Sequence, residues 1–464
     1  MKKSIISIFF IILLSTLLFP KNLTLHDYND PSAHHILDAD IQDDLLVVSG
    51  MIGGIEFYDI SNSQVLNHLD NLTLSGGGGG GGQGGGTKPH CIKLFDDYAY
   101  VTTNRGLGII NISNPNNPQY LGIVSGTNNY ILENLDVLND ILVVAAHEDG
   151  ILIYDVSNPS NPSYITTIDT ENSWTATLND NILYVADEQI LEMYSISNGF
   201  SYLNSIELSN AIKDIAINSN VLYVAIGSDG VVAYNIEQES NITLIDAYNT
   251  SAMANKLATF DYNKVAVSDW DDVEILETNF DDAIDLVGYK NTTRRTMAIA
   301  TKDNYIYSAE WAAVQVFEYG EISGPDIDLN TYELNYPYVP NSDSYTMSLE
   351  ITNNGNSILN IIDAYTTNNE FSYSELNDLY PGETQVVDIV YSANSNNSSG
   401  SYRILTNDND EPEIICETNG NINGANIGDV APNFELDIIA NGVGSFQLSD
   451  YIGKIIVLAF FAPN

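Results

Sequence analysis

The sequence predicts an all-β protein whose largest part is a seven-bladed propeller. Three observations support this prediction: β-branched and aromatic residues recur in short apolar runs, 29 of the 464 residues are Tyr, and one pattern repeats along the chain. Runs of this composition favour strands. Since they lack the 3.6-residue period of long amphipathic helices, we expect strands as the main secondary structure.

The repeated unit is an Asp or Asn followed by an apolar strand. These anchor residues stand about forty residues apart once a glycine-rich insertion at residues 76–86 is set aside, and roughly 40–45 residues make one four-stranded propeller blade. The anchors are Asp44, Asp97, Asp140, Asn181, Asn220, Asn263 and Asn304. Further strands follow each anchor, as at residues 150–155 and 164–168, and the strand before the anchor completes the blade.

Seven such units predict a closed ring over residues 30–320. A single blade cannot bury both of its faces, so the copies must pack against one another. An open solenoid is the alternative architecture, but it would need capping repeats that the sequence does not show. The sixth and seventh units match the pattern less well than the second and third.

Composition excludes several classes of protein. With 62 acidic and only 15 basic residues, the formal net charge is −47, which argues against a nucleic-acid partner because phosphate binding needs clustered cations. Hydrophobic residues make up 44% of the chain, which a disordered acidic chain would not carry. Cys91 and Cys416 lie far apart, so a disulfide framework and a cysteine zinc site are both disfavoured.

The N-terminus has the features of a secretory signal. Lys2 and Lys3 precede an apolar stretch over residues 5–19, as in the charged and apolar regions of signal peptides. We assign residues 1–20 to this signal and expect export to the periplasm, outer surface or extracellular space. An uncleaved anchor is the alternative, although the stretch is short for the ~20 residues that cross a bilayer.

The second and third units resemble a known repeat family. Both carry a Ser-Asn-Pro-Xaa-Asn-Pro turn, at residues 113–118 and 157–162, after a strand such as residues 108–112. This pattern is similar to the LVIVD repeat of exported and surface-associated propeller proteins. The resemblance implies a propeller and assigns no chemistry, because propellers serve many functions.

Residues 326–423 show a different strand pattern, with turn signals at residues 353–355 and 381–382. They resemble the immunoglobulin-like sandwich of the ASPM, SPD-2 and Hydin type, whose usual size is about a hundred residues. The resemblance implies a β-sandwich that acts as a spacer or adhesion module.

Residues 427–464 resemble the opening of a redoxin, the thioredoxin-like family of alkyl hydroperoxide reductases and thiol-specific antioxidants. Three motifs stand in the family's order: Gly-Asp-Xaa-Ala-Pro-Xaa-Phe from Gly428, Leu-Ser-Asp-Tyr-Xaa-Gly-Lys up to Lys454, and a strand ending in Phe-Phe-Ala. The resemblance implies a truncated α/β segment and places the nucleophile immediately after Asn464. No catalytic residue is therefore expected within the chain itself.

Two explanations remain open for a sequence that stops directly before the position of the family's nucleophile. One is an incomplete gene or a premature stop, and the other is a UGA codon that encodes selenocysteine. When complete, the protein is expected to be an antioxidant oxidoreductase that attacks a peroxide or a disulfide through a thiolate or selenolate, with no cofactor. The alternative function is a non-enzymatic cell-surface binding or adhesion protein, with an unknown protein or surface ligand on the propeller.

Candidate binding residues follow from the repeat itself. Seven residues before each anchor, the innermost strands are expected to enter around one mouth of a central channel. These positions hold Leu37, His90, Glu133, Trp174, Lys213, Lys256 and Met297, with His35, Lys88, Arg294 and Arg295 close by. We propose His90, Glu133, Trp174, Lys213 and Lys256 as a site for an anion or an acidic partner. The favoured alternative is that the cations only pair with Glu133, Asp136 and Asp214.

Metal sites have weaker support. His34, His35 and His90 show no regular ligand spacing. Three acidic groups could supply oxygen ligands to Ca²⁺, but none follows the EF-hand pattern, so we expect solvated turns and no metal. The groups are Asp38 with Asp40, Asp269 with Asp271 and Asp272, and Asp408 with Asp410 and Glu411. The glycine-rich insertion lacks the features of a phosphate-binding loop and is expected to be a surface loop.

Overall fold

The structure is a computed structural model that describes most of the chain between residues 21 and 421. The described residues are 21–74, 87–238, 241–279, 283–321, 324–337, 339–394, 398–409, 411–421, 435–437 and 445–447. The signal predicted at residues 1–20 and the glycine-rich insertion lie outside them. In the described part every regular element is a strand, and none is an apolar helix of membrane-spanning length.

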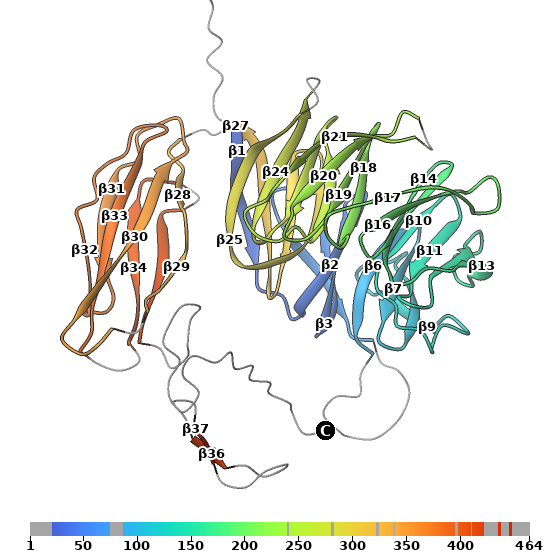
Figure 1. Cartoon of the computed structure of the whole chain (residues 1–464), viewed down its shortest axis with the longest axis horizontal. Helices are drawn as coiled ribbons and strands as arrows, with labels where there is room; N and C mark the ends of the chain where they lie inside the picture. Colours follow the sequence, from blue (N-terminus) through green and yellow to red (C-terminus); the bar gives the residue numbers. More distant parts are fainter. Residues whose placement is uncertain are drawn as a thin grey trace, which may run out of the picture. The chain divides into compact units, whose positions relative to one another are not determined.

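The chain divides into two compact units, the first reaching Gly324 and including Asn354–Asn356. The first unit is a β-propeller (Figure 1), and its first five blades are antiparallel four-stranded sheets in chain order. Blade one is β2 (His34–Gln42), β3 (Leu45–Ile52), β4 (Gly54–Asp59) and β5 (Asn67–Leu72); blade two is β6 (Pro89–Phe95), β7 (Tyr98–Thr103), β8 (Gly106–Asn111) and β9 (Gln119–Ile123). Blade three is β10 (Leu135–Leu138), β11 (Ile141–Ala145), β12 (Ile151–Asp155) and β13 (Ser163–Ile168). Blade four is β14 (Ser173–Asn179), β15 (Ile182–Asp187), β16 (Ile190–Ser195) and β17 (Ser201–Glu207); blade five is β18 (Asp214–Asn218), β19 (Val221–Ala225), β20 (Val231–Asn235) and β21 (Thr243–Tyr248).

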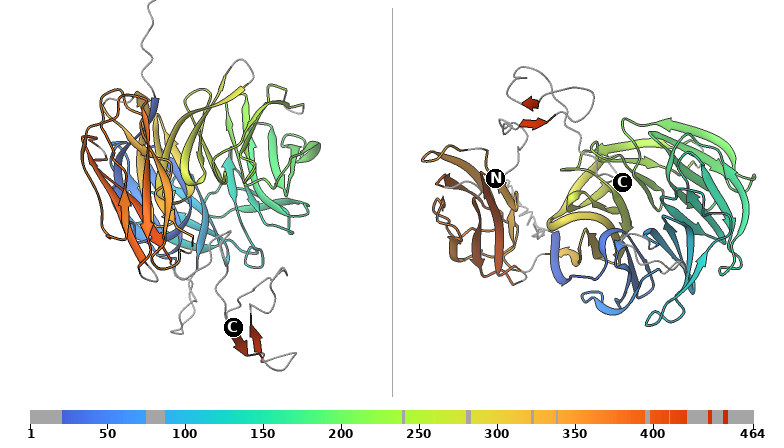
Figure 2. Two further views of the ribbon diagram at one scale, coloured as in Figure 1. Left: turned by 60° about the vertical axis from the view of Figure 1, so that its left-hand side comes forward. Right: turned by 90° about the horizontal axis from the view of Figure 1, so that it is seen from below.

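The last two blades share one long strand, β25 (Ala283–Lys302). Its first half pairs with β24 and its second half with β26, so the two blades form one seven-stranded sheet. Blade six adds β22 (Lys256–Phe260), β23 (Lys264–Ser268) and β24 (Trp270–Asn279); blade seven adds β26 (Tyr305–Glu310) and β27 (Ala313–Glu321). Within the described residues the ring therefore has seven blades, which the right-hand view of Figure 2 shows arranged around a centre.

The ring is closed by a strand that the repeat pattern does not contain. β1 (Lys21–Asn29) pairs antiparallel with β27 and forms the outermost strand of blade seven. Strands from the two ends of the propeller sequence thus share a sheet, which joins the start of the ring to its last blade. The predicted start at residue 30 omits this strand.

A tight hairpin turn stands directly before most anchors of the repeat. The residue before most anchors has a positive φ, a conformation that Asp and Asn tolerate because their short side chains bond to nearby backbone. These residues are Asp43, Asp96, Asn139, Asp180, Ser219 and Asp303, with φ between 34° and 55°. The hairpin joins the innermost strand of each blade to the next one, which fixes where the innermost strand begins and ends.

The propeller core lies between neighbouring blades. Most apolar clusters combine residues from two consecutive blades, such as Tyr184 and Leu191 of blade four with Leu222 and Val232 of blade five. Removal of this apolar surface from water is the main stabilising contribution to the ring. It also holds the innermost strands side by side around the central channel.

The second unit contains two four-stranded sheets. One consists of β28 (Ile327–Leu329), β30 (Ser344–Asn353), β33 (Thr384–Ser392) and β32 (Phe371–Tyr373) in that order; the other is β29 (Glu333–Asn335), β35 (Glu413–Gly420), β34 (Ser398–Thr406) and β31 (Ile361–Thr366). Leu349 and Val387 of the first sheet share one core with Tyr402 and Ile404 of the second. This unit is a two-sheet sandwich.

The redoxin-like segment predicted at residues 427–464 lies outside the described residues, except for two short strands. β36 (Glu435–Asp437) pairs antiparallel with β37 (Ser445–Gln447). The described part therefore shows no thioredoxin-like α/β segment, and the fold that the structure supports is all-β.

Candidate binding site at the mouth of the central channel

The innermost strands of the blades carry the predicted site residues, and β-bulges set their direction. A bulge inserts one extra residue into a strand and re-aims a side chain. The pairing register shifts at the position seven before the anchor in β2, β6, β14 and β25. In three of these strands the residues that fall in the shift are Leu37, Trp174 and Met297. The bulge explains why two successive residues of such a strand both reach the channel.

All seven positions predicted from the repeat line one cavity of about 180 Å³. The repeat did not indicate four other residues there, because each lies one position after, or shortly before, the position counted from the anchor. Cys91 and Asn134 follow such a position, and Met253 and Asn255 precede the innermost strand of blade six. The cavity is lined by Leu37, His90, Glu133, Trp174, Lys213, Lys256 and Met297 together with Cys91, Asn134, Met253 and Asn255. His35 instead stacks on Trp311, and Arg295 lies over Trp270.

Lys213 is the distinctive charge of this cavity. Its Nζ lies 4.8 Å from the centre of the Trp174 ring, within the range of a cation–π contact. Within the residues that the structure describes, Lys213 forms no ion pair with a carboxylate. The predicted pairing with Glu133 or Asp214 is therefore not the arrangement of this ammonium group.

Glu133 and His90 complete the polar part of the mouth. Glu133 Oε2 lies 3.2 Å from His147 Nε2, and the His147 ring packs edge-on against Trp174. Burial lowers the pKa of His90 below its ordinary value of 6.5, so its imidazole is neutral at pH 7. A neutral imidazole supplies one hydrogen-bond donor and one acceptor. The repeat pattern did not indicate His147 as a site residue, because His147 lies on a loop after the second strand of blade three.

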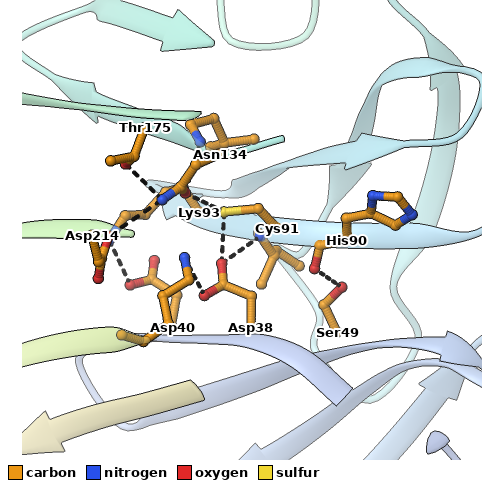
Figure 3. A network of polar contacts seen from close by, with 12 residues as sticks. Asp38, Asp40, Ser49, His90, Cys91, Lys93, Asn134, Thr175 and Asp214 are labelled. Atoms are coloured by element: carbon orange, nitrogen blue, oxygen red, sulfur yellow. Dashed lines mark hydrogen bonds and ion pairs between the residues drawn. The ribbon is translucent and has the colours of Figure 1, made fainter. Parts of the chain in front are cut away.

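Lys256 is paired, although its partner is not among the predicted ones. Its Nζ lies 3.2 Å from Asp38 Oδ1, and Asp38 Oδ2 accepts hydrogen bonds from the Cys91 thiol at 2.7 Å and the Ile92 N–H at 2.9 Å (Figure 3). Asp38 was expected to be a solvated turn residue. This expectation is wrong, because only 7% of the residue is exposed.

Below the mouth, acidic side chains join one blade to the next. Asp40 accepts the Leu94 N–H, Asp136 the Leu178 N–H and Asp214 the Leu257 N–H, each at 2.8 to 2.9 Å. They line a deeper cavity of about 270 Å³ with Lys93, whose Nζ lies 3.2 Å from Asp40 Oδ1. Burial raises the pKa of all three carboxyls, with the lysines lowering it in part.

These contacts limit the chemistry that the channel can perform. Burial raises the pKa of the Cys91 thiol well above its ordinary value, so the group is not a thiolate nucleophile at neutral pH. Among the described residues, the two acidic groups that could hold a metal ion are Asp269–Asp271–Asp272 and Asp326–Asp408–Glu411, and none of these residues lines the mouth cavity. The mouth is suited to binding through one ammonium group, an imidazole and apolar walls.

Comparison with known proteins supports the propeller and its repeat. Residues 89–125 and 133–170, which span blades two and three, match the LVIVD repeat. The chain is thus a β-propeller that contains LVIVD repeats, and the two best predicted units are the ones that match. No curated protein sequence matches the chain.

Solved structures show the same fold. A chain in the crystal structure of the mitotic checkpoint complex is 12% identical, with 68% of this chain and 98% of that chain covered and a TM-score of 0.53. The structure of U3-55K is 10% identical, covering 64% and 98%, with a TM-score of 0.52. The RRP9 WD40 repeats are 11% identical, covering 65% and 100%, with a TM-score of 0.52. At these identities the likeness shows the fold alone.

Proposed function

We propose that the propeller is a non-enzymatic binding module that recognises a carboxylate group at the channel mouth. The observation that carries the proposal is Lys213, an ammonium group held over Trp174 inside a cavity without a carboxylate partner in the described residues. A ligand carboxylate supplies the missing partner and forms a charge-assisted hydrogen bond. The neutral His90 ring offers a second hydrogen bond, and Leu37, Met253 and Met297 cover an apolar portion of the ligand.

The charge of the protein restricts the kind of carboxylate. A net charge of −47 repels extended polyanions, whereas the field of distant surface charges is screened within about 8 Å at physiological ionic strength. Deeper in the channel, Asp40, Asp136 and Asp214 oppose the entry of an anion. The proposed ligand is therefore a small mono- or dicarboxylate, or one carboxylate group on a partner protein.

The other parts of the chain suit a surface role. The sequence features of residues 1–20 support export, and the two-sheet sandwich supports an immunoglobulin-like spacer that presents the propeller. We assign the sandwich to the ASPM, SPD-2 and Hydin type on its sequence motifs alone. In this proposal the protein is exported and binds at a cell surface or in the periplasm.

A second candidate function rests on residues 427–464. Their three redoxin motifs in family order favour a thiol or selenol oxidoreductase, with the propeller and sandwich as its recruiting modules. The coding sequence after codon 464 tests this candidate. An in-frame UGA or Cys codon followed by a redoxin-like continuation supports it, and the absence of such a frame contradicts it.

The binding proposal is tested with the full chain and a panel of small carboxylates, such as succinate, pyruvate and benzoate, by thermal unfolding. A ligand that binds only the folded state raises the melting temperature. We expect at least one carboxylate to stabilise the wild type and not the Lys213→Met variant. The matched control is Lys302→Met, which removes the same charge at the last residue of β25, where Lys302 pairs with Asp44 outside the mouth cavity. Equal stabilisation of wild type and Lys213→Met contradicts the proposal.

A further inference from the structure

A cluster of buried carboxylates lies in blade six, and none of its members lines the channel-mouth cavity. The hairpin between β23 and β24 is closed by Asp269, Trp270, Asp271 and Asp272, with the Asp269 N–H donating to the Asp272 carbonyl at 3.1 Å. The three Asp side chains each place one oxygen within 4.8 Å of the others. Asp269 and Asp272 are 0% and 1% exposed, while Asp271 is exposed. The expectation that this group is a solvated turn is wrong for the two buried residues.

Each buried carboxylate is held by one oxygen and leaves the other without a hydrogen bond. The Ala252 N–H donates to Asp269 Oδ2 at 2.6 Å, and the Ser251 hydroxyl lies 2.8 Å from Asp272 Oδ2. The remaining oxygens, Asp269 Oδ1 and Asp272 Oδ1, are buried without a partner. Such atoms are rare, since buried polar groups are nearly always hydrogen-bonded.

Glu274, from the body of strand β24, provides an independent observation of the same kind. Its Oε1 accepts the Ser251 N–H at 2.9 Å, so its carboxylate is held by the same residue as Asp272. Its Oε2 is buried without a partner, and the residue is 1% exposed. Glu274 lies outside the hairpin turn, yet its Oε2 is a third buried carboxylate oxygen without a hydrogen bond, on a residue held by the same Ser251.

The four acids lack a cationic ion-pair partner among the described residues. The nearby Arg295 guanidinium lies over the Trp270 ring, and Lys264, also in blade six, pairs with Asp261 and Glu277. Unpaired buried carboxylates are costly unless they become neutral or bind a cation.

We propose that Asp269, Asp271 and Asp272 bind a Ca²⁺ ion, with Asp271 at the solvent side and the Glu274 carboxylate beside the site. Ca²⁺ takes oxygen ligands at 2.3–2.6 Å, so oxygens on opposite sides of one ion are about 5 Å apart, which fits the spacing of the Asp oxygens. It also accepts irregular ligand arrangements, whereas Mg²⁺ demands near-octahedral ones. Water molecules complete the six to eight ligands. The ion fixes the connection at Ser251 and Ala252 to the β23–β24 hairpin.

The test compares thermal unfolding of the full chain in a chelator and in Ca²⁺ or Mg²⁺ at neutral pH. For a ring of about 300 residues, Ca²⁺ at about 100 times its Kd raises the melting temperature by roughly 4 °C. Mg²⁺ at the same concentration is expected to have a smaller effect. Equal melting temperatures in chelator and in millimolar Ca²⁺ overturn the proposal, because an ion that binds the folded state must stabilise it.

Variants separate a cation site from a structural role. Asp272→Asn should weaken Ca²⁺ binding at least about tenfold, yet in chelator it should melt at or above the wild type because it removes a buried like charge. Asp149→Asn, at an exposed position, is the matched control and should behave as the wild type. An undiminished Ca²⁺ response of Asp272→Asn overturns the proposal.

Trp270 gives a readout that does not depend on stability. Tb³⁺ bound in place of Ca²⁺ should show luminescence sensitised by this indole, which Ca²⁺ suppresses by competition and Trp270→Phe abolishes. Sensitised emission that persists in Trp270→Phe places the ion elsewhere and overturns the assignment. Asp269→Asn, which removes another buried ligand of the group, serves as the second variant if Asp272→Asn does not fold.

Discussion

Closure of the propeller by β1 makes Leu23 a sensitive position, although it lies outside every repeat. The side chain is fully buried among Ile275, Ile299 and Phe317, in a cluster that spans blades six and seven. Replacing a buried Leu by Ala costs about 2–5 kcal/mol, from lost burial and from the cavity that remains. We expect about 3 kcal/mol for Leu23→Ala.

This loss converts into a measurable melting shift. The unfolding entropy is about 2.1 cal/mol/K per residue, which gives roughly 0.6 kcal/mol/K for about 300 residues, so 3 kcal/mol lowers the melting temperature by about 5 °C. Calorimetry of the full chain measures the shift. The control is Leu121→Ala on the outer strand β9, where the Leu is 50% exposed and the expected shift is below about 1 °C. Equal melting temperatures of the two variants would refute the packing of β1 in blade seven.

Three further predictions concern the ring and its channel. Gly150→Ala should destabilise the propeller by more than about 2 kcal/mol, because φ is +81° and an added Cβ would lie 2.1 Å from the Ile168 carbonyl oxygen. The control Gly126→Ala, with φ +90° and open space around it, should cost about 1 kcal/mol. Equal losses of unfolding free energy in denaturant titrations of the two variants would exclude the clash. Lys256→Met should lower the free energy of unfolding by about 2–4 kcal/mol, because it leaves Asp38 buried without its ammonium partner. Lys302 pairs with the largely exposed Asp44, so Lys302→Met should cost less than about 1 kcal/mol in the same titrations. Asp136→Asn tests the raised pKa of the channel carboxyls. Because the folded state holds the Asp136 proton more tightly than the unfolded state, protonation of Asp136 stabilises the fold. This stabilisation is fully present below the unfolded pKa of about 4 and is lost as the pH rises through the folded pKa. The variant should therefore gain stability relative to the wild type between pH 4 and pH 7, and a pH-independent difference would contradict the assignment.

Repetition made the propeller and its mouth predictable. An equal offset from each anchor places residues at one level of the channel, so Trp174 and Lys213 could be assigned to one site from the sequence alone. The repeat also located blades two and three, which match the LVIVD repeat. The features that recur in every blade are its turns and the alternation of buried and exposed residues along its strands. Both depend on local sequence, so they can be predicted from the residues.

Features that occur once in the ring could not be predicted in this way. β1 has no repeat signature because it supplies a single strand to a blade built from the other end of the propeller. The pairing of Lys256 with Asp38 joins blades six and one across the channel, and nothing in the spacing of these residues along the chain indicates it. The burial of Asp269 and Asp272 was also missed, because acidic residues in a turn are usually solvated and only packing of the neighbouring segment covers them.

The most direct test of the binding account is the ratio of two dissociation constants. Calorimetric titration of the best carboxylate of the panel into the wild type and into Lys213→Met compares the site with and without its unpaired ammonium group. Loss of one charge-assisted hydrogen bond of about 1.5–3 kcal/mol predicts a Kd at least about tenfold higher in the variant. A Kd that is unchanged in Lys213→Met would contradict recognition of the ligand at the channel mouth.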